Sequence, residues 1–277
     1  MEYGGLIYFN VALTSFRSPP SLLFCQAAAA GSFFEQQSVV SVDLSTGPPF
    51  TVLTNTTSFK TDSVIVATGA DSRWLGVEGE HEYRGGGVSS CATCDGFLFK
   101  DQRVVVIGGG DTAMEDALVL ARTSKSVLLI HRRDKFRASK VLAKRVLANA
   151  KITVRWDSIV TSFSGKQVAT EGGDGPQSIL SHVNIRHTKT GATEAYACAA
   201  AFVAIGHDPN TKMFQGLLEM DANGYLVTGG GAGTLTSTSV EGVFAAGDVA
   251  DHVYRQAVTS AGTGAMAAMD VERWLEA

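Results

Sequence analysis

Two cysteines separated by two residues, Cys91 and Cys94, are the residues of this sequence best suited to chemistry. Cysteines at this spacing can close a small disulfide ring, and a helix N-terminus can activate their thiolates. The spacing also occurs in half of a zinc site, which needs about four ligands, but Cys25 and Cys198 stand alone in the sequence. A redox-active pair is therefore favoured, with a zinc site and an inert buried pair as alternatives. Asp95 follows directly, where it suits a proton donor and acceptor or, equally, a helix cap or turn.

A glycine turn, Gly108-x-Gly110-x-x-Ala113, lies further along the chain. A β-branched run predicts a strand at 103–107 before it, and an amphipathic pattern predicts a helix at 112–122 after it. This is the context that a dinucleotide-binding turn requires. The first glycine permits a tight turn, the second lets the backbone approach a pyrophosphate, and Ala113 allows close packing. The helix N-terminus attracts phosphate.

A basic cluster follows the second strand of this pattern, which is predicted at 126–130. An NAD-specific site would usually place a carboxylate there, whereas this sequence has His131, Arg132 and Arg133, followed by Arg137. Planar guanidinium groups suit bidentate contacts with phosphate, so the position favours a 2′-phosphate. A solvated loop and a nucleic-acid site are the alternatives for a short basic run. With a net charge of -4 and a pI of about 5.9 the chain has no wider basic stripe, so we expect NADPH and no nucleic acid as partner.

The remaining patterns describe the elements that would position these residues. Strands are predicted at 152–156, 183–187, 200–205 and 225–228, with a polar loop at 165–176 and a flexible glycine turn at 229–233. Together they suit an α/β fold with a βαβ domain that carries an antiparallel excursion.

Length and composition agree with this organisation. The chain has 277 residues, 45% of them hydrophobic, which is enough for one or two cores. No apolar run approaches the ~20 residues that span a membrane, so we expect a soluble protein with no membrane partner. Four cysteines, two of them in one motif, do not form a disulfide scaffold, which favours a reducing compartment, the cytoplasm or an organelle, over secretion.

Several blocks of the sequence resemble low-molecular-weight thioredoxin reductases in their order and spacing. The blocks are CATCDG, VVVIGGGDTAMEDAL, HRRDKFRASK, AIGHDPNTK, GYLVT and SVEGVFAAGDVADHVYRQAVTSAGTGAMAA. The resemblance extends from about Gln36 to the C-terminus and implies two βαβ, Rossmann-like nucleotide-binding domains. The NADPH-binding domain, expected at 76–205, would be inserted between two parts of an FAD domain at 36–75 and 206–277. Residues 1–35 would form an atypical segment.

The same resemblance implies the residues that hold the two cofactors. NADPH would be bound by the glycine turn and the basic cluster, namely Gly108, Gly109, Gly110, Asp111, Thr112, Ala113, His131, Arg132, Arg133 and Arg137. FAD would be bound by Thr68, Gly69, Gly247, Asp248, Arg255, Gln256 and Ala257. Without the resemblance, the FAD segments are two strands that end in turns, at 64–70 and 243–248, and a helix start at 255–257.

The activity that the resemblance implies is a relay from NADPH through FAD and the cysteine pair to a thioredoxin-type protein. Cys91 would attack the substrate disulfide, Cys94 would face the flavin, and Asp95 would move the proton. Related enzymes are homodimers, so a homodimer is expected.

One part of the family pattern is absent from this sequence. The Gly-x-Gly-x-x-Gly turn that holds the FAD pyrophosphate does not occur in residues 1–34. We therefore expect an N-terminally truncated FAD domain and an incomplete FAD site. The alternatives are another flavin-dependent disulfide reductase of this architecture, such as a peroxiredoxin reductase, a non-catalytic NADPH-binding fragment, and a zinc or scaffold protein.

Overall fold

The computed structural model describes residues 7–9, 22–169, 175–230 and 234–277. The chain divides into two compact units: unit 1 comprises Met1–Asp71 and Asp208–Ala277, and unit 2 comprises Ser72–His207. Part of the atypical segment expected at 1–35, and residues 231–233 of the expected glycine turn, lie outside the described residues.

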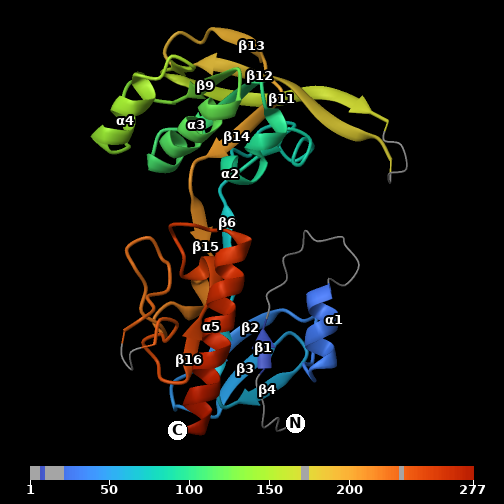
Figure 1. Cartoon of the computed structure of the whole chain (residues 1–277), viewed down its shortest axis with the longest axis vertical. Helices are drawn as coiled ribbons and strands as arrows, with labels where there is room; N and C mark the ends of the chain where they lie inside the picture. Colours follow the sequence, from blue (N-terminus) through green and yellow to red (C-terminus); the bar gives the residue numbers. More distant parts are fainter. Residues whose placement is uncertain (1–6, 10–21, 170–174, 231–233) are drawn as a thin grey trace. The chain divides into compact units, whose positions relative to one another are not determined.

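Unit 2 is built on a five-stranded parallel sheet (Figure 1). Its strands, in sheet order, are β10 (Ile152–Arg155), β9 (Ser126–Ile130), β8 (Arg103–Gly108), β14 (Ala200–Ala204) and β7 (Val88–Ser89). Its helices are α2 (Ala92–Asp95), the 3-10 turn η1 (Gly96–Phe99), α3 (Asp111–Thr123) and α4 (Lys140–Leu147). The strands predicted at 103–107 and 126–130 and the helix predicted at 112–122 are confirmed.

The alternation of side chains along β8 explains why this sheet is covered on both faces. Successive residues of a strand point to opposite sides, and here both sets are apolar. Val104 and Val106 lie in the core with α3, whereas Val105 and Ile107 lie in the core with a second sheet. Each such side chain stabilises the unit by about 1.5–3 kcal/mol on full burial.

The second sheet of unit 2 is antiparallel and consists of β11 (Ser158–Val168), β12 (Gln177–His187) and β13 (Thr193–Ala197). The expected antiparallel excursion is confirmed. The polar loop expected at 165–176 is wrong for residues 165–168, which extend β11. Gly165 and Lys166 pair there with Leu180 and Ile179, so a partner strand overrides their weak local preference.

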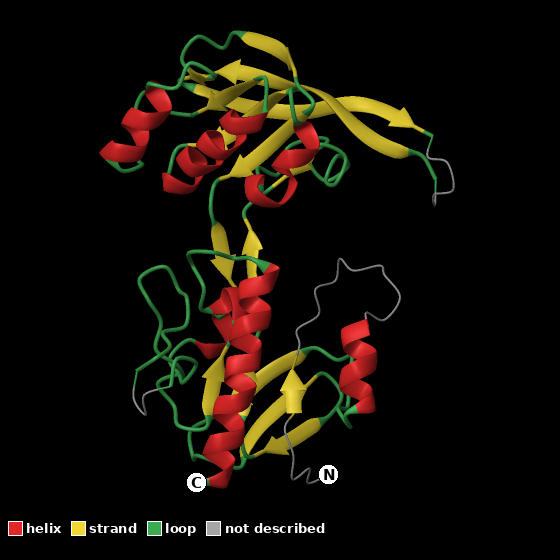
Figure 2. Ribbon diagram, viewed as in Figure 1, coloured by secondary structure: helices red, strands yellow, loops and turns green. Residues whose placement is uncertain are grey.

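Unit 1 contains two three-stranded sheets, shown with its long helix in Figure 2. The parallel sheet has the order β1 (Ile7–Phe9), β5 (Val64–Val66) and β16 (Val243–Ala245), and the antiparallel sheet has the order β2 (Val39–Asp43), β3 (Phe50–Thr54) and β4 (Ser58–Thr61). The helices are α1 (Leu22–Ala29), η2 (Lys212–Phe214), η3 (Gly247–Val249) and α5 (Ala257–Glu276). Ile65 and Phe244 pack against Ala267 and Val271 of α5.

The strand predicted at 225–228 is wrong. Leu226 forms only an isolated bridge with Met220, and the other residues of the segment have no strand partner within the described part of the chain. A short apolar run indicates that its residues are buried, but it does not show that they pair with another strand. Tyr225 and Leu226 are buried here without belonging to a strand.

The chain passes between the units along two strands that pair with each other, β6 (Ala70–Ser72) and β15 (His207–Pro209). Among the helices that the structure describes, none combines the length and apolar character needed to cross a membrane.

Candidate active site

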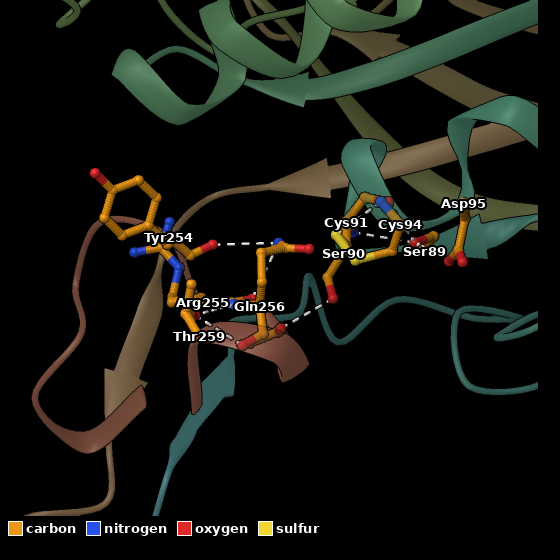
Figure 3. Close-up of a disulfide and its surroundings, with 10 residues drawn as sticks. Ser89, Ser90, Cys91, Cys94, Asp95, Tyr254, Arg255, Gln256 and Thr259 are labelled. Atoms are coloured by element: carbon orange, nitrogen blue, oxygen red, sulfur yellow. Dashed lines mark hydrogen bonds between the residues drawn. A yellow bond between two sulfur atoms is a disulfide. The ribbon is translucent and has the colours of Figure 1, made fainter. Parts of the chain in front are cut away.

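Cys91 and Cys94 form a disulfide at the start of α2, with their Cα atoms 5.3 Å apart (Figure 3). Cys91 is the N-cap of this one-turn helix, and its Sγ accepts a hydrogen bond of 3.1 Å from the Cys94 backbone N–H. The single helical turn therefore brings the two sulfurs together. Gly96 lets α2 lie close to α3, because a Cβ at this position would be 2.8 Å from Leu120 Cδ2.

A serine connects the disulfide segment to the carboxylate that follows it. The Ser89 hydroxyl donates to Asp95 Oδ2 at 2.7 Å and accepts from the Cys91 backbone N–H at 3.0 Å. The Asp95 N–H in turn donates to the Cys91 carbonyl oxygen at 3.1 Å. Asp95 was predicted from the sequence, but Ser89 was not, because a serine beside a second serine gives no periodic or motif signal.

Two large apolar side chains are exposed in the segment that follows the disulfide. Cys94 is exposed and Cys91 is half-buried. Phe97 and Leu98, in the 3-10 turn that follows, expose 69% and 59% of their surface. Large apolar side chains exposed beside a reactive group are typical of a protein-binding site.

The glycine turn joins β8 to α3, with Gly110 as the helix N-cap. A Cβ at Gly108 would lie 2.3 Å from the Ala204 carbonyl oxygen and 2.7 Å from Ala113 Cβ. A Cβ at Gly109 would lie 2.1 Å from the ring of His131. The turn is thus fixed by close packing on two sides, and it leaves the N-terminus of α3 for an anion.

The basic loop after β9 is fastened to this turn through its backbone. The N–H groups of Arg137 and Ala138 both donate to the Gly109 carbonyl oxygen, at 2.9 and 3.1 Å. Asp111 Oδ1 accepts from the Ser139 N–H at 2.7 Å, which ties the first residue of α3 to the N-cap of α4.

His131 supports this loop from inside. It is 8% exposed, and its Nδ1 and Nε2 lie 3.0 Å and 2.9 Å from the carbonyl oxygens of Gly108 and Lys135. The side chains of Arg132, Arg133 and Arg137 are exposed. The structure therefore gathers the predicted NADPH residues at one edge of the sheet of unit 2, with His131 in a supporting position beneath them.

Unit 1 has a cavity of about 910 Å³ where several predicted FAD residues meet. Its lining includes Thr68, Gly69, Gly247 and Asp248, together with residues that were not predicted, among them Asn210 and Ser260. A volume of this size is typical of a cofactor site.

Side-chain hydrogen bonds hold the lining of this cavity in place. The Thr68 hydroxyl donates to the Asn210 carbonyl oxygen at 2.8 Å, and Asn210 Nδ2 donates to the Thr68 carbonyl oxygen at 3.0 Å. The Ser260 hydroxyl donates to Asp248 Oδ1 at 3.0 Å, and the Gly247 N–H donates to Thr263 Oγ1 at 2.9 Å. Ser260 and Thr263 lie one turn apart on α5, a spacing that could have indicated a shared role.

Arg255, Gln256 and Ala257 form the start of α5, as predicted. Arg255 adopts a φ of +49°, and Gln256 caps the helix in a capping box with Thr259 (Figure 3). Asp251 organises this segment: its carboxylate accepts from the N–H groups of Val253, Tyr254 and Arg255 at 2.8–3.0 Å. Partial burial opposes its ionisation, but these backbone hydrogen bonds and that from Thr259 lower the pKa of Asp251 below its ordinary value.

The other cysteines differ from the pair in their surroundings. Cys198 is buried, and this burial raises its thiol pKa to about 12, whereas Cys25 is exposed on α1. Within the described residues no group of three or more His, Cys, Asp or Glu side chains is placed to hold a metal ion.

Comparison with known proteins finds several thioredoxin reductases among the relatives of this chain. Residues 15–264 match the family model "Pyridine nucleotide-disulphide oxidoreductase". The thioredoxin reductase of Rickettsia conorii is 45% identical over 254 residues, covering 91% of this chain and 78% of that protein. The thioredoxin reductase of Streptomyces clavuligerus is 48% identical over 253 residues, covering 91% of this chain and 74% of its own length. The solved structure of thioredoxin reductase from Giardia duodenalis is 40% identical, with a TM-score of 0.82 over 92% of this chain and 80% of that one.

Proposed function

The chain belongs to the pyridine nucleotide-disulphide oxidoreductase family and, within it, to the thioredoxin reductases, and we propose that its Cys91–Cys94 disulfide passes electrons from NADPH, by way of FAD, to a thioredoxin-type protein disulfide. The observation that carries this proposal is the disulfide itself, which is closed at a helix start beside a carboxylate. The same compact unit contains the glycine turn.

The two cysteines divide the thiol chemistry between them. Reduction of the disulfide takes two electrons and two protons and leaves a thiol on each cysteine. The Cys91 thiolate then attacks the partner's disulfide, which forms a mixed disulfide and releases one partner sulfur. The Cys94 thiolate attacks that mixed disulfide, which frees the second partner sulfur and restores the Cys91–Cys94 bond.

Asp95 manages the protons of these steps. A thiol must lose its proton before it attacks, and each leaving sulfur must gain one. The Asp95 carboxylate belongs to the same hydrogen-bonded segment as Cys91, through Ser89, and would carry out this transfer.

NADPH fits the edge of the sheet in unit 2. The turn of Gly108, Gly109 and Gly110 and the N-terminus of α3 would hold its pyrophosphate. Arg132, Arg133 and Arg137 would hold its 2′-phosphate, since guanidinium groups bind phosphate bidentately. Asp111, Ala113 and His131 shape and support the turn, and Thr112, in the first turn of α3, would lie beside the pyrophosphate.

FAD fits the cavity of unit 1 in part. Thr68, Gly69, Gly247 and Asp248 line the cavity and would meet the ribityl and phosphate region. Arg255, Gln256 and Ala257 would meet the flavin ring. When bound, the flavin supplies the disulfide with the electron pair that it has received from NADPH.

Three further properties follow from the family and from the cysteine chemistry. The protein substrate would dock on the apolar surface beside the disulfide. A working reductase with a reducible cysteine pair fits a reducing compartment, the cytoplasm in the simplest case or an organelle. A homodimer is also proposed, and light scattering after size-exclusion chromatography measures it.

The experiment that tests the proposal follows the electrons through the purified chain. FAD is added, excess cofactor is removed by desalting, and NADPH is then added without oxygen while the visible spectrum is recorded. Retained flavin absorbance that bleaches, followed by NADPH-dependent reduction of thioredoxin, supports the proposal. Cys91→Ser and Cys94→Ser should abolish thioredoxin reduction, whereas Cys25→Ser, which changes an exposed cysteine on α1, should not. A colourless chain that still binds NADPH would indicate a nucleotide-binding protein without reductase activity.

A further inference from the structure

The Ser89 hydroxyl lies near two acceptors, Asp95 Oδ2 at 2.7 Å and the Cys91 carbonyl oxygen at 3.5 Å, and the contact with the carboxylate is much the shorter. The oxygen accepts the Cys91 backbone N–H at 3.0 Å, and the hydroxyl donates to Asp95 Oδ2 at 2.7 Å. The backbone N–H can only donate, and an ionised carboxylate can only accept, so the Ser89 oxygen accepts from Cys91 and its proton goes to Asp95 while Asp95 is charged.

This direction distinguishes the two oxygens of the Asp95 carboxylate. Oδ2 accepts from Ser89, and a proton on that oxygen would displace this 2.7 Å hydrogen bond, which favours Oδ1 as the oxygen that takes up a proton. A proton on Asp95 would reside on Oδ1. The hydroxyl also joins the carboxylate to the backbone of Cys91, so Asp95 keeps a constant position relative to that cysteine.

We propose that Ser89 is a positioning residue for disulfide exchange: it holds Asp95 through Oδ2, so that Oδ1 exchanges the proton with sulfur. This inference rests on the proposed function of Cys91 and Asp95 and adds to it the residue that orients the carboxylate. The residue touches neither the partner nor the reacting sulfurs in this role and acts through Asp95.

Disulfide exchange at Cys91 includes one proton transfer from Asp95. The Cys91 thiolate attacks one sulfur of a disulfide, the new S–S bond forms as the old one breaks, and the leaving sulfur takes the proton from Asp95 Oδ1. This leaves Asp95 as a carboxylate, and the carboxylic acid is regenerated when Asp95 takes up the proton of the next thiol that ionises. The demand for this proton depends on the leaving group, because a leaving thiol of low pKa departs readily as a thiolate.

The test uses the whole chain and needs neither flavin nor NADPH. The chain is reduced with dithiothreitol and desalted, and its oxidation by a disulfide is followed by stopped flow. Two probes are compared: bis(2-hydroxyethyl) disulfide, whose alkyl thiolate needs a proton to leave, and the aromatic disulfide DTNB, whose thiolate does not. The variants are Ser89→Ala, Ser89→Thr, Asp95→Asn and the double variant Ser89→Ala/Asp95→Asn. Ser181→Ala serves as control, because it removes an exposed hydroxyl of unit 2 whose partners, the Ser164 carbonyl oxygen and His182 Nδ1, both belong to the antiparallel sheet.

The expected results follow from the loss of a positioned proton donor, whose full contribution is typically 10²–10⁴-fold. Ser89→Ala should slow the alkyl probe by about tenfold and DTNB by less than about twofold, and Ser89→Thr should restore most of the loss, since it keeps a hydroxyl. The double variant should be no slower than Asp95→Asn alone. The control should match the wild-type chain with both probes.

Two results would overturn the inference. Wild-type rates in Ser89→Ala with the alkyl probe would show that Asp95 needs no such support. An equal slowing with both probes would show that Ser89 only stabilises the loop. Because this half-reaction is free of cofactors, it gives the same answer whether or not the chain retains FAD, so failure of the reductase assay and failure of this inference are distinguishable.

Discussion

The His131 ring fills the space that a side chain at position 109 would need. A Cβ at position 109 would lie 2.1 Å from the imidazole ring, and the ring is held by the carbonyl oxygens of Gly108 and Lys135. Each ring nitrogen lies at hydrogen-bond distance from a carbonyl oxygen, so the ring cannot move aside without losing at least one of these close contacts. Glycine is thus required at position 109 because the His131 ring lies against it, independently of whether a phosphate group also approaches the backbone there.

Replacing this glycine should destabilise unit 2 even in the absence of nucleotide. For Gly109→Ala we expect a loss of about 1–3 kcal/mol in the free energy of unfolding, the usual cost of overpacking. Urea denaturation followed by circular dichroism measures it. Gly110→Ala is the matched control, because its Cβ would lie 3.6 Å from the nearest atom, in Arg137, an ordinary contact. Equal stability of the two variants would contradict the explanation.

Asp251 gives a second prediction at the scale of one residue, and this one depends on pH. Its pKa is lowered in the folded chain, so its stabilising effect is fully present above the pKa of the unfolded chain, about 3.9. The effect is lost as the pH falls through the lower folded value. Asp251→Asn, which weakens hydrogen bonds to a charged acceptor, should cost about 1–2 kcal/mol at pH 7.

The measurement is a series of denaturation curves for wild type and Asp251→Asn between pH 7 and pH 3. The difference between the two proteins should shrink toward the acid end. Asp43→Asn is the control: Asp43 also accepts a backbone N–H and a hydroxyl from Ser45, but it is the exposed last residue of β2. A constant difference for Asp251→Asn at all pH values would argue against the ionised carboxylate as its cause.

At the scale of elements, the loop after β9 holds several exposed arginines on a backbone that is hydrogen-bonded to the glycine turn. Its backbone is bonded to Gly109, and Ser139 is bonded to Asp111, so its exposed arginines start from a fixed base beside the N-terminus of α3. Fixing a loop in advance reduces the entropy lost on binding. Such a loop should bind a dinucleotide that carries a 2′-phosphate more tightly than one that lacks it.

This predicts a preference for NADPH over NADH that depends on the loop. Arg132→Ala and Arg137→Ala should each raise the Kd for NADPH by about tenfold or more, as expected for the loss of a charge-assisted hydrogen bond, and change the Kd for NADH by less than about twofold. Titration calorimetry measures both. Arg155→Ala is the control, because this arginine ends the adjacent strand β10 and pairs with Glu194. Equal losses for both nucleotides would mean that the arginines do not read the 2′-phosphate.

The elements of unit 2 were largely predictable because their signals are local. The buried run of β8, the glycine turn and the amphipathic α3 follow one another within a short stretch, and each has its own pattern. The ends of β11 and β12 were not predictable, because Gly165 and Lys166 are strand residues only through pairing with Ile179 and Leu180. Ser89, Asn210 and Asp251 escaped prediction for a related reason: each acts through polar hydrogen bonds, which leave no periodic trace in the sequence.

At the scale of the whole molecule, unit 2 is a continuous insertion in unit 1. Its two ends are neighbours, since the Arg73 N–H donates to the Gly206 carbonyl oxygen at 2.9 Å. It has cores on both faces of its central sheet, drawn from its own residues. These are the properties of an independently folding domain.

Residues 72–207 should therefore fold when expressed alone. We expect a cooperative unfolding transition, a Cys91–Cys94 disulfide and a Kd for NADPH within about threefold of that of the whole chain, since the proposed NADPH residues lie inside this range. Dispersed amide resonances in an NMR spectrum and calorimetry are the measurements. A chain without a cooperative transition would show that unit 2 depends on unit 1.

The pairing of β5 with β16 has a consequence for how the protein is made. Val64 and Val243 are register partners in one parallel sheet, although the whole of unit 2 lies between them in the sequence. On a ribosome the inserted unit emerges completely before β16 and α5 are synthesised, and domains generally fold as they emerge. Unit 1 must therefore wait with one side of β5 and its apolar partners uncovered until the C-terminal residues are released. Newly made chains should depend on chaperones mainly during this interval, and premature termination before Val243 should yield a folded insert carried by an aggregation-prone remainder.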